Sequence, residues 1–394
     1  MFGKYARFAV CLGIATTIAA CHQNEAPNPA GVHEGVEVAL NTTRTLVVKL
    51  TGEGASAARV NFAGKTLRPN AENIVTFEGA EKKGDLKVTG DGLIEQNIKD
   101  LDFGDRTSMV IEIDVVSSVS TNIIPQANAE NGDDVTNDSG NQSRTGVTSK
   151  LNVGTGGTAP AYAGTERDYS LVVYTPAAAP IPVSETVPNH DYNLAPYAVD
   201  CQPSGTEFDP AHPAHIELTI PGLGEIGNHE DVAFRFDGEH AIKDPLSKVV
   251  EGDVLKADVT HFSAWNVFIN AKCTGISEDT EILKAGSLSA GDNKIDYTEF
   301  VGFESDVKGI LYKWVKLLFG ATKTGVNKST TINAPSVGSF TISQKKFTIS
   351  FLAGNKPFSV VAYGETTCTV NYTGDVTPDT KPVPVPTHNG GSSD

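Results

Sequence analysis

Short runs of alternating apolar and polar residues recur along this chain, and glycine, proline, asparagine or aspartate separate one run from the next. Alternation with period two puts the apolar side chains on one face of a β-strand, and the separators are the residues that turns require. Residues 45–50, 109–115 and 346–351 show the pattern most clearly. We therefore expect a mainly β protein, with tandem antiparallel β-sandwich domains and a C-terminal α+β region that contains one amphipathic helix.

The first twenty residues have the pattern of a secretory signal peptide. Lys4 and Arg7 give a positively charged start, and residues 8–20 carry no charge. These thirteen residues rise only about 20 Å as a helix, which is shorter than the ~30 Å hydrocarbon core of a membrane. We therefore expect residues 1–20 to be a cleaved signal and not a permanent membrane span.

Ile18-Ala19-Ala20-Cys21 resembles the lipobox of bacterial lipoproteins. The resemblance implies that Cys21 takes a diacylglycerol, becomes the N-terminus after cleavage, and is then acylated, for example with palmitate. In many Gram-negative species an aspartate after this cysteine retains a lipoprotein at the inner membrane. His22 follows here, so the implied location is the outer membrane, on a side that the sequence leaves open. The alternative is an ordinary signal peptide that contains a cysteine.

The charge balance excludes one class of partner. The formal net charge is −17, and loss of Lys4 and Arg7 with the signal takes the mature chain to −17 − 2 = −19. Such a chain repels phosphate backbones, so we expect no nucleic-acid partner. The expected partners are the membrane, through the N-terminal lipid, and a glycan or protein ligand.

The first half of the mature chain divides by composition. Residues 21–35 are polar and contain prolines, which predicts an extended tether. Residues 36–117 carry about six strand signals, which predicts a small antiparallel β-sandwich. The phrase Val-Asn-Phe-Ala-Gly at residues 60–64 and the run 111–115 weakly resemble the carboxypeptidase-regulatory and PEGA-type sandwiches, which implies a spacer or adhesion unit. Residues 118–145 are rich in Ser, Asn, Asp and Gly, which predicts a linker.

Residues 146–271 carry two motifs in a fixed order. Residues 203–210 read Pro-x-Gly-x-x-Phe-x-Pro before an alternating strand, and residues 261–265 read His-Phe-Ser-x-Trp. Together they resemble the ZU-type (zona occludens/uncoordinated) β-sandwich of ankyrins and netrin receptors. The GAIN domain of adhesion receptors ends in a related way. The resemblance covers about 125 residues and implies a β-sandwich over residues 146–271.

Residues 272–374 alternate strand signals with one helix, predicted at residues 306–319. Its apolar residues share one helical face: Val307, Ile310, Leu311, Trp314, Leu317 and Leu318. Lys308, Lys313 and Lys316 fall on the opposite face, which we expect to be solvated. Ser305 or Asp306 can cap the start, and Gly320 ends the helix. We expect the apolar face to pack on its own sheet, with a partner-binding surface as the alternative. Residues 375–394 lack core-forming side chains, which predicts a disordered tail.

Three of the five cysteines belong to the folded body. Cys11 leaves with the signal and Cys21 is the lipidation site, which leaves Cys201, Cys273 and Cys368. An odd number allows at most one intramolecular disulfide, and an exported compartment permits it. We expect that disulfide to join Cys273 to Cys368, in the first and last strands of the C-terminal region. Cys201 is then a buried free thiol.

His261-Phe262-Ser263 is the one string with a mechanism attached. The matching peptide cleaves itself in a nucleoporin domain, in some ZU-type domains and, with a different middle residue, in GAIN domains. The resemblance implies Ser263 as nucleophile, the Phe262 carbonyl as the scissile group and His261 as general base. We favour a structural role instead, with Phe262 in the core, residues 254–267 forming an ordinary strand, and the chain intact.

No set of metal ligands is recognisable. His212 and His215 lie in a proline-containing loop with no acidic ligand at helix spacing, and His229 and His240 follow without a fixed face. A calcium loop that starts at Asp134 would have Ser139 and Thr145 where glycine and glutamate belong. We therefore expect no metal and no cofactor.

Two functions of different class follow from these patterns. We favour a lipid-anchored, non-catalytic module of the cell envelope or surface, which serves adhesion or as a scaffold. The rival is a self-processing protein that cleaves between Phe262 and Ser263. The sequence leaves the ligand and the oligomeric state open.

Overall fold

The computed structural model describes residues 32–373, except for 41, 105, 119–122, 125–133, 137–143, 154–168, 228 and 238–241. The signal peptide, Cys21, His240, Ser139 and the predicted tail lie outside the described residues, and so does most of the predicted linker. The described chain is mainly β and arranged in several sheets, which confirms the predicted fold class. None of the described helices has the length and apolar character needed to cross a membrane.

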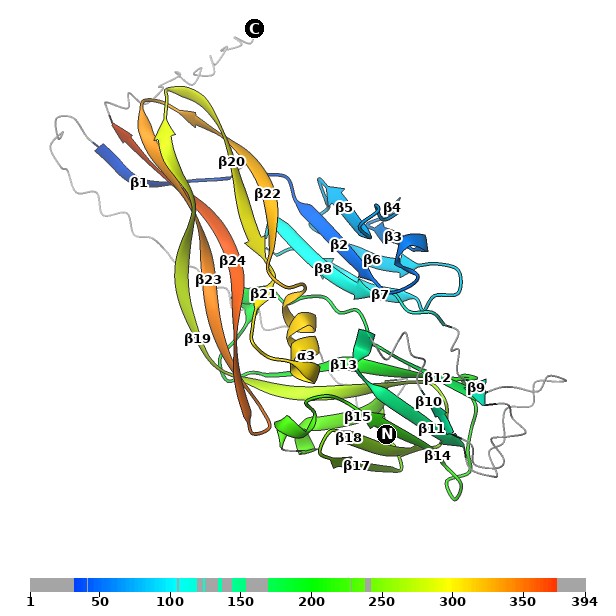
Figure 1. The fold of residues 1–394 in the computed structure, drawn as a ribbon. Coiled ribbons are helices and arrows are strands. Elements are labelled where there is room, and N and C mark those ends of the chain that lie inside the picture. The colour runs from blue at the N-terminus through cyan, green and yellow to red at the C-terminus, as the bar shows by residue number, and fades with distance from the viewer. Residues whose placement is uncertain are drawn as a thin grey trace, which may run out of the picture.

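The N-terminal sandwich is built from two small sheets (Figure 1). The first has the order β5-β2-β8, and the second has the order β4-β3-β6-β7. Their bounds are β2 (Thr45–Thr51), β3 (Arg59–Phe62), β4 (Lys65–Leu67), β5 (Ile74–Glu78), β6 (Lys83–Thr89), β7 (Gln96–Asp102) and β8 (Ser108–Asp114). The alternation of β2 buries Leu46 and Val48 completely between the sheets. One pair departs from the antiparallel prediction, because β2 and β8 run parallel.

A second sandwich follows. One of its sheets has the order β10-β11-β14-β18-β17. The other is one end of a ten-stranded sheet and consists of β9, β12, β13, the first part of β19, β15 and β16. We call this sandwich, together with the N-terminal one, the body of the protein. The bounds are β9 (Ile123–Ile124), β10 (Asp134–Thr136), β11 (Thr148–Val153), β12 (Tyr169–Tyr174), β13 (Asp191–Gln202), β14 (Ala214–Thr219), β15 (Val232–Asp237), β16 (Ile242–Lys243), β17 (Ser247–Glu251), β18 (Val254–Val259) and β19 (Ala264–Leu288). The largest hydrophobic cluster fills the space between these sheets and reaches the helix α3 (Gly309–Phe319).

The boundary predicted between residues 271 and 272 does not separate two folded units. Strand β19 runs through it for 25 residues. Its first part pairs with β13 and β15, and its part from Lys272 onward pairs with β23 (Gly338–Ala353). The continuous alternation of buried residues up to Cys273 gives the strand no reason to end at the boundary.

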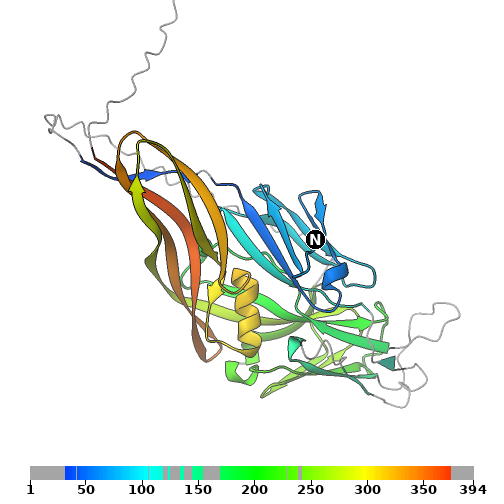
Figure 2. The same cartoon turned by 45° about the horizontal axis from the view of Figure 1, so that its top comes forward.

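The second part of β19 forms an arm together with β23, β24 (Lys356–Thr373) and β1 (Val32–Val38) (Figures 1 and 2). The antiparallel pair of β20 (Gly291–Val301) and β22 (Thr324–Ala334) packs on the arm through a separate apolar cluster, and the short β21 (Phe303–Glu304) pairs with β24. Strand β1 pairs with β24 from Val32 opposite Thr373 to Val38 opposite Cys368. Residues 32–35 are therefore strand, which corrects the predicted end of the tether at residue 35.

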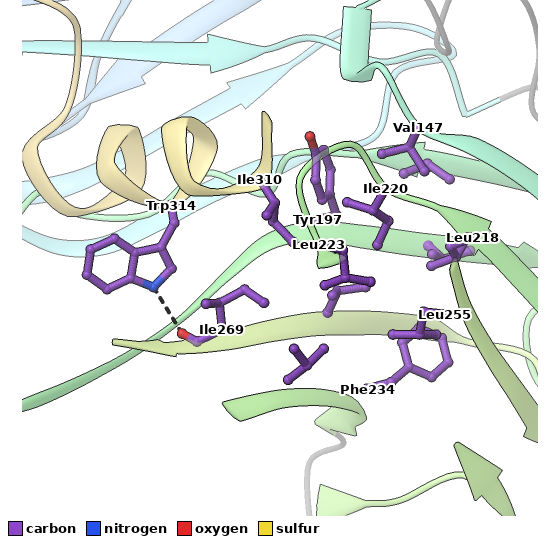
Figure 3. Close-up of a cluster of buried hydrophobic side chains, with 14 of the residues drawn as sticks. Val147, Tyr197, Leu218, Ile220, Leu223, Phe234, Leu255, Ile269, Ile310 and Trp314 are labelled. Atoms are coloured by element: carbon purple, nitrogen blue, oxygen red, sulfur yellow. Dashed lines mark hydrogen bonds between the residues drawn. The ribbon is translucent and has the colours of Figure 1, made fainter. Parts of the chain in front are cut away.

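Helix α3 packs its apolar face on the second sandwich, as Figure 3 shows for Ile310 and Trp314. The Trp314 indole N–H donates to the Ile269 carbonyl over 2.9 Å. The helix begins at Gly309 and not at residue 306, because Gly309 has a positive φ of 59° and the Ile310 N–H donates to the Pro221 carbonyl. The C-cap at Gly320 confirms the predicted end of the helix.

Candidate functional site

The His-Phe-Ser motif lies in a turn between two strands. Strand β18 ends at Val259 and β19 begins at Ala264, so residues 254–267 are not one ordinary strand as we expected. The interruption is fixed by contacts to the loop that follows β13: the Phe262 N–H donates to the Thr206 carbonyl over 2.8 Å. The Phe208 N–H likewise donates to the Thr260 carbonyl over 2.7 Å. This loop belongs to the first predicted motif, so the fold brings the two motifs together.

Phe262 is fully buried, which confirms its predicted place in the core. Its ring meets the rings of Phe208 and Tyr169 edge to face, with centroid distances of 4.8 and 5.8 Å. The His261 ring contacts the rings of Phe236 and Trp265 at 4.9 and 5.0 Å. The motif therefore contributes apolar and aromatic contacts to the sandwich.

The same turn also presents the Phe262 carbonyl to a hydrogen-bond donor. The Gly205 N–H donates to this oxygen over 2.9 Å. Such a donor polarises a carbonyl, and it is also an ordinary loop hydrogen bond. Ser263 is half-buried, and its own carbonyl accepts from the Cys201 N–H over 3.2 Å.

The predicted disulfide between Cys273 and Cys368 is wrong. Cys201, Cys273 and Cys368 are all free and buried. In the sheet register, Cys273 lies opposite Phe351 of β23, and Cys368 lies opposite Ile342. Nine positions of β23 separate these two partners, which corresponds to roughly 30 Å along the strand. The physical reason is that β19 and β24 lie on opposite sides of β23, with Cys273 near the end of the arm that joins the second sandwich and Cys368 closer to the far end.

Of the described histidines considered as metal ligands, none gathers with two further His, Cys, Asp or Glu side chains. His215 lies on the exposed face of β14, where its Nδ1 is 2.5 Å from Asp258 Oδ1. Ser247 donates to the other oxygen of Asp258 over 2.6 Å. The carboxylate lies between the other two groups, so the serine hydroxyl is not activated by the imidazole as in a hydrolase triad. In the described part of the chain, no three His, Cys, Asp or Glu side chains gather as a metal site would require.

A cavity of about 210 Å³ lies where the N-terminal sandwich meets α3. Its walls come from segments that are far apart in the sequence, and we call it the junction cavity. Its polar and charged lining residues are Thr51, Glu112, Asp114, Arg144, Thr175, Lys313 and Lys316. Ile111, Ile113, Pro176, Ala177, Ala178, Leu317 and Gly320 complete the lining.

Two ion pairs cross the junction cavity region. Arg144 Nε donates to Asp114 Oδ1 over 3.1 Å, and the Lys316 ammonium pairs with Glu112 of the neighbouring sandwich. Lys316 is only 9% exposed, which corrects its predicted position on a solvated face. Strand β8 covers that face of the helix. Lys316 is therefore enclosed and needs a counter-charge, which Glu112 provides.

Burial dominates the electrostatics of the junction cavity. It raises the pKa of the Asp114 carboxyl above its ordinary value, and the charge of Arg144 opposes this shift. Burial also lowers the pKa of the Lys313 ammonium, and the nearby Lys316 charge lowers it further. Three cations and two carboxylates line the cavity, so their formal sum is 3 − 2 = +1.

Sequence reasoning missed the junction cavity. Glu112 and Asp114 sit at alternate positions of β8 and so share a face, but nothing in the local pattern says that a helix two hundred residues later covers it. The available signal was weak: two acidic residues in a strand flanked by apolar ones, and two lysines near the end of an amphipathic helix.

A second polar cluster, centred on Glu299, joins the N-terminal sandwich to the two-stranded sheet of β20 and β22. Glu299 is 4% exposed and accepts hydrogen bonds from three hydroxyls, those of Thr107, Ser108 and Thr366. Nearby, the Lys328 ammonium donates to the carbonyls of Thr43 and Thr107 and to the Thr45 hydroxyl. We call these residues the Glu299 cluster.

Comparison with known proteins gives little further guidance. No family model and no curated protein match the chain. A solved structure from Bacteroides fragilis NCTC 9343, described as a "putative membrane-associated protein of unknown function", is similar over 87% of this chain and 100% of its own. Its sequence identity is 10% and its TM-score is 0.28, values too low to support an argument about fold or function.

Proposed function

We propose that this chain is a lipid-anchored, non-catalytic module of the bacterial outer membrane, in which the arm links the anchor to a ligand-binding or scaffolding body. The observation that carries the proposal is the position of β1. Ten residues separate Cys21 from Val32, and Val32 lies opposite Thr373 at the far end of the arm. A lipid on Cys21 would therefore attach the protein by the end of the arm that points away from the body.

The arm has the dimensions of a spacer. Leu352 of β23 lies opposite Lys272 at the body, and Gly338 lies opposite Leu288 at the far end. The fourteen positions between Gly338 and Leu352 correspond to roughly 45 Å. The second sandwich lies at the other end of the arm, so the arm holds it at a distance from the anchor, while the N-terminal sandwich lies beside β20 and β22 (Figure 1).

The anchoring is tested by the substitution Cys21→Ser in the full-length precursor. We expect wild-type protein to partition into the detergent phase and the variant to remain as uncleaved precursor or to enter the aqueous phase. Cys11→Ser is the matched control, because this cysteine lies inside the predicted signal and should not alter partitioning. Wild-type protein found wholly in the aqueous phase would contradict the proposal.

Self-cleavage between Phe262 and Ser263 is the second candidate function. It is favoured by the turn that replaces the expected strand, and by the hydrogen bond from the Gly205 N–H to the Phe262 carbonyl. The general base would be His261 and the nucleophile Ser263. We rank it second because Phe262 and His261 are both used in aromatic packing.

Two substitutions in the motif separate the structural role from self-cleavage. Phe262→Ala removes a fully buried aromatic ring and should lower the free energy of unfolding by about 3–5 kcal/mol. Ser263→Ala should leave both stability and the mass of the chain nearly unchanged. Denaturant unfolding and intact-mass spectrometry provide the readouts. A new N-terminus at Ser263 that is lost in Ser263→Ala would instead establish self-cleavage.

A further inference from the structure

Two of the residues that line the junction cavity each have a buried polar atom that the described residues leave without a hydrogen-bond partner. One is Oδ2 of Asp114, a side chain only 7% exposed, and the other is the hydroxyl of Thr175, also 7% exposed. Asp114 uses its other oxygen for Arg144. A buried carboxylate oxygen or hydroxyl that stays unpaired destabilises the folded state, so such groups in native structures call for a partner.

The cavity also contains a cation without a direct counter-ion. Arg144 pairs with Asp114 and Lys316 pairs with Glu112, whereas Lys313 makes no ion pair or hydrogen bond with any residue that the structure describes. The excess charge of the lining therefore lies at the Lys313 ammonium. An anionic group is the natural partner for it.

These three groups specify a ligand with two different polar ends. Asp114 Oδ2 accepts only and needs a donor, Lys313 donates only and needs an acceptor with negative charge, and the Thr175 hydroxyl serves either. A plain anion would leave Asp114 unmatched and would be repelled by it. A neutral polyol would leave Lys313 without a counter-charge.

The volume limits the size of the ligand. An engineered cavity of about 150 Å³ binds benzene, which has about six non-hydrogen atoms, so a cavity of about 210 Å³ has room for a ligand of about seven or eight. A hexose has about twelve non-hydrogen atoms and exceeds this space. A ligand of about seven non-hydrogen atoms, with a short apolar part against Ile113, Ala177 and Leu317, fits it.

We propose that the junction cavity binds a small α-substituted carboxylic acid, an α-amino or α-hydroxy acid, with its carboxylate on Lys313 and its amino or hydroxyl group donating to Asp114 Oδ2. The Thr175 hydroxyl provides a third contact. This inference rests on the proposed ligand-binding role of the body, and it adds to that role a site and a class of ligand. Because the walls belong to both the N-terminal sandwich and α3, the bound ligand also fixes these two parts against each other.

The test is titration calorimetry with the full-length protein in detergent. L-Alanine and L-serine represent the amino acids, and L-lactate and D-glycerate represent the hydroxy acids. Acetate has only the carboxylate expected to bind Lys313, and methylammonium has only the donor expected to bind Asp114. We expect saturable binding of at least one pair, with acetate and methylammonium at least about tenfold weaker. The pair that binds more tightly identifies the group that meets Asp114.

Variants then locate the site. Lys313→Met and Asp114→Asn should each weaken binding by about tenfold or more, because each removes a charge-assisted contact. Thr175→Val keeps the shape of the side chain and should weaken binding less, and it serves where Asp114→Asn fails to fold. Lys308→Met is the matched control, since Lys308 precedes the same helix but lies outside the cavity lining.

Three outcomes would overturn the proposal: no binding of any of the four acids, equal binding of acetate, or unchanged affinity in Lys313→Met. The first would mean that water alone satisfies the cavity, and the second that it takes an adventitious ion only. None of them bears on the anchor. Conversely, a failure of the Cys21 experiment would leave this binding measurement intact, so the two proposals fail separately.

Discussion

The Glu299 cluster and the junction cavity both join the N-terminal sandwich to the C-terminal part of the chain. They differ in how completely their buried polar groups are hydrogen-bonded. In the Glu299 cluster, three hydroxyls reach the carboxylate, and all three protons of the Lys328 ammonium have an acceptor. In the junction cavity, Asp114 Oδ2 and the Thr175 hydroxyl are left over. A satisfied polar cluster stabilises the contact between two parts of a protein, whereas an incompletely satisfied one next to a cavity is suited to a ligand.

The largest effect should come from removing the carboxylate of the Glu299 cluster. Glu299→Leu leaves three hydroxyls without their acceptor, among them that of the buried Ser108, and places an apolar side chain beside Lys328. We expect a loss of about 3 kcal/mol or more in the free energy of unfolding, measured with urea. Glu299→Gln retains an acceptor and should lower the free energy of unfolding less.

The control is Glu281→Leu, which lies on the part of β19 that pairs on one side only and should change stability little. Equal losses for Glu281→Leu and Glu299→Leu would remove the contrast between the two clusters.

A smaller effect is expected at the junction cavity. Asp114→Asn keeps an acceptor for Arg144 and removes a charge that burial disfavours, so the two contributions oppose each other. We expect the free energy of unfolding in ligand-free protein to change by less than about 1 kcal/mol. A loss as large as that for Glu299→Leu would mean that the carboxylate is a structural group like Glu299, and would weaken the case for a ligand site.

The smallest effect is a difference in the sign of pH dependence. Burial raises the pKa of Asp114, so its folded form binds a proton more readily than the unfolded form. The stability that this contributes is present below the unfolded pKa and is lost as pH rises through the folded pKa. Acidification from about pH 7 to about pH 4 should therefore stabilise wild-type protein relative to Asp114→Asn.

Asp258 provides the opposite case. Burial acts to raise its pKa, but hydrogen bonds from Ser247 and His215 lower it below the ordinary value. Its contribution is present above the unfolded pKa and is lost as pH falls through the folded pKa. The same acidification should therefore destabilise wild-type protein relative to Asp258→Asn. Urea unfolding at several pH values checks both predictions. If the difference in free energy of unfolding between wild type and variant changed with pH in the same direction for Asp114→Asn and Asp258→Asn, the opposite roles of the two carboxylates would be refuted.

Local patterns predicted those parts of the fold that depend on neighbouring residues. The alternation in residues 45–50 predicted a half-buried strand, and β2 buries Leu46 and Val48 as expected. The apolar stripe that includes Trp314 predicted a helix on its own sheet, and the indole lies against β19. Phe262 is buried as predicted, but contacts of its turn with the loop at Thr206 place it there, and not a continuous strand. The start of α3 was not predicted correctly, because it depends on a hydrogen bond to the distant Pro221 carbonyl.

Residue patterns alone predicted the fold class, the alternating burial of Leu46 and Val48, and the end of the helix at Gly320, because each depends on periodicity or on backbone preferences that act over a few positions. The tertiary structure alone decided which distant segments meet. It continued β19 through the expected boundary, set Cys273 and Cys368 at different heights of the arm, and enclosed Lys316 under β8. The junction cavity belongs to this second group, since strand register and helix packing over two hundred residues of chain bring Asp114 and Lys313 to one site.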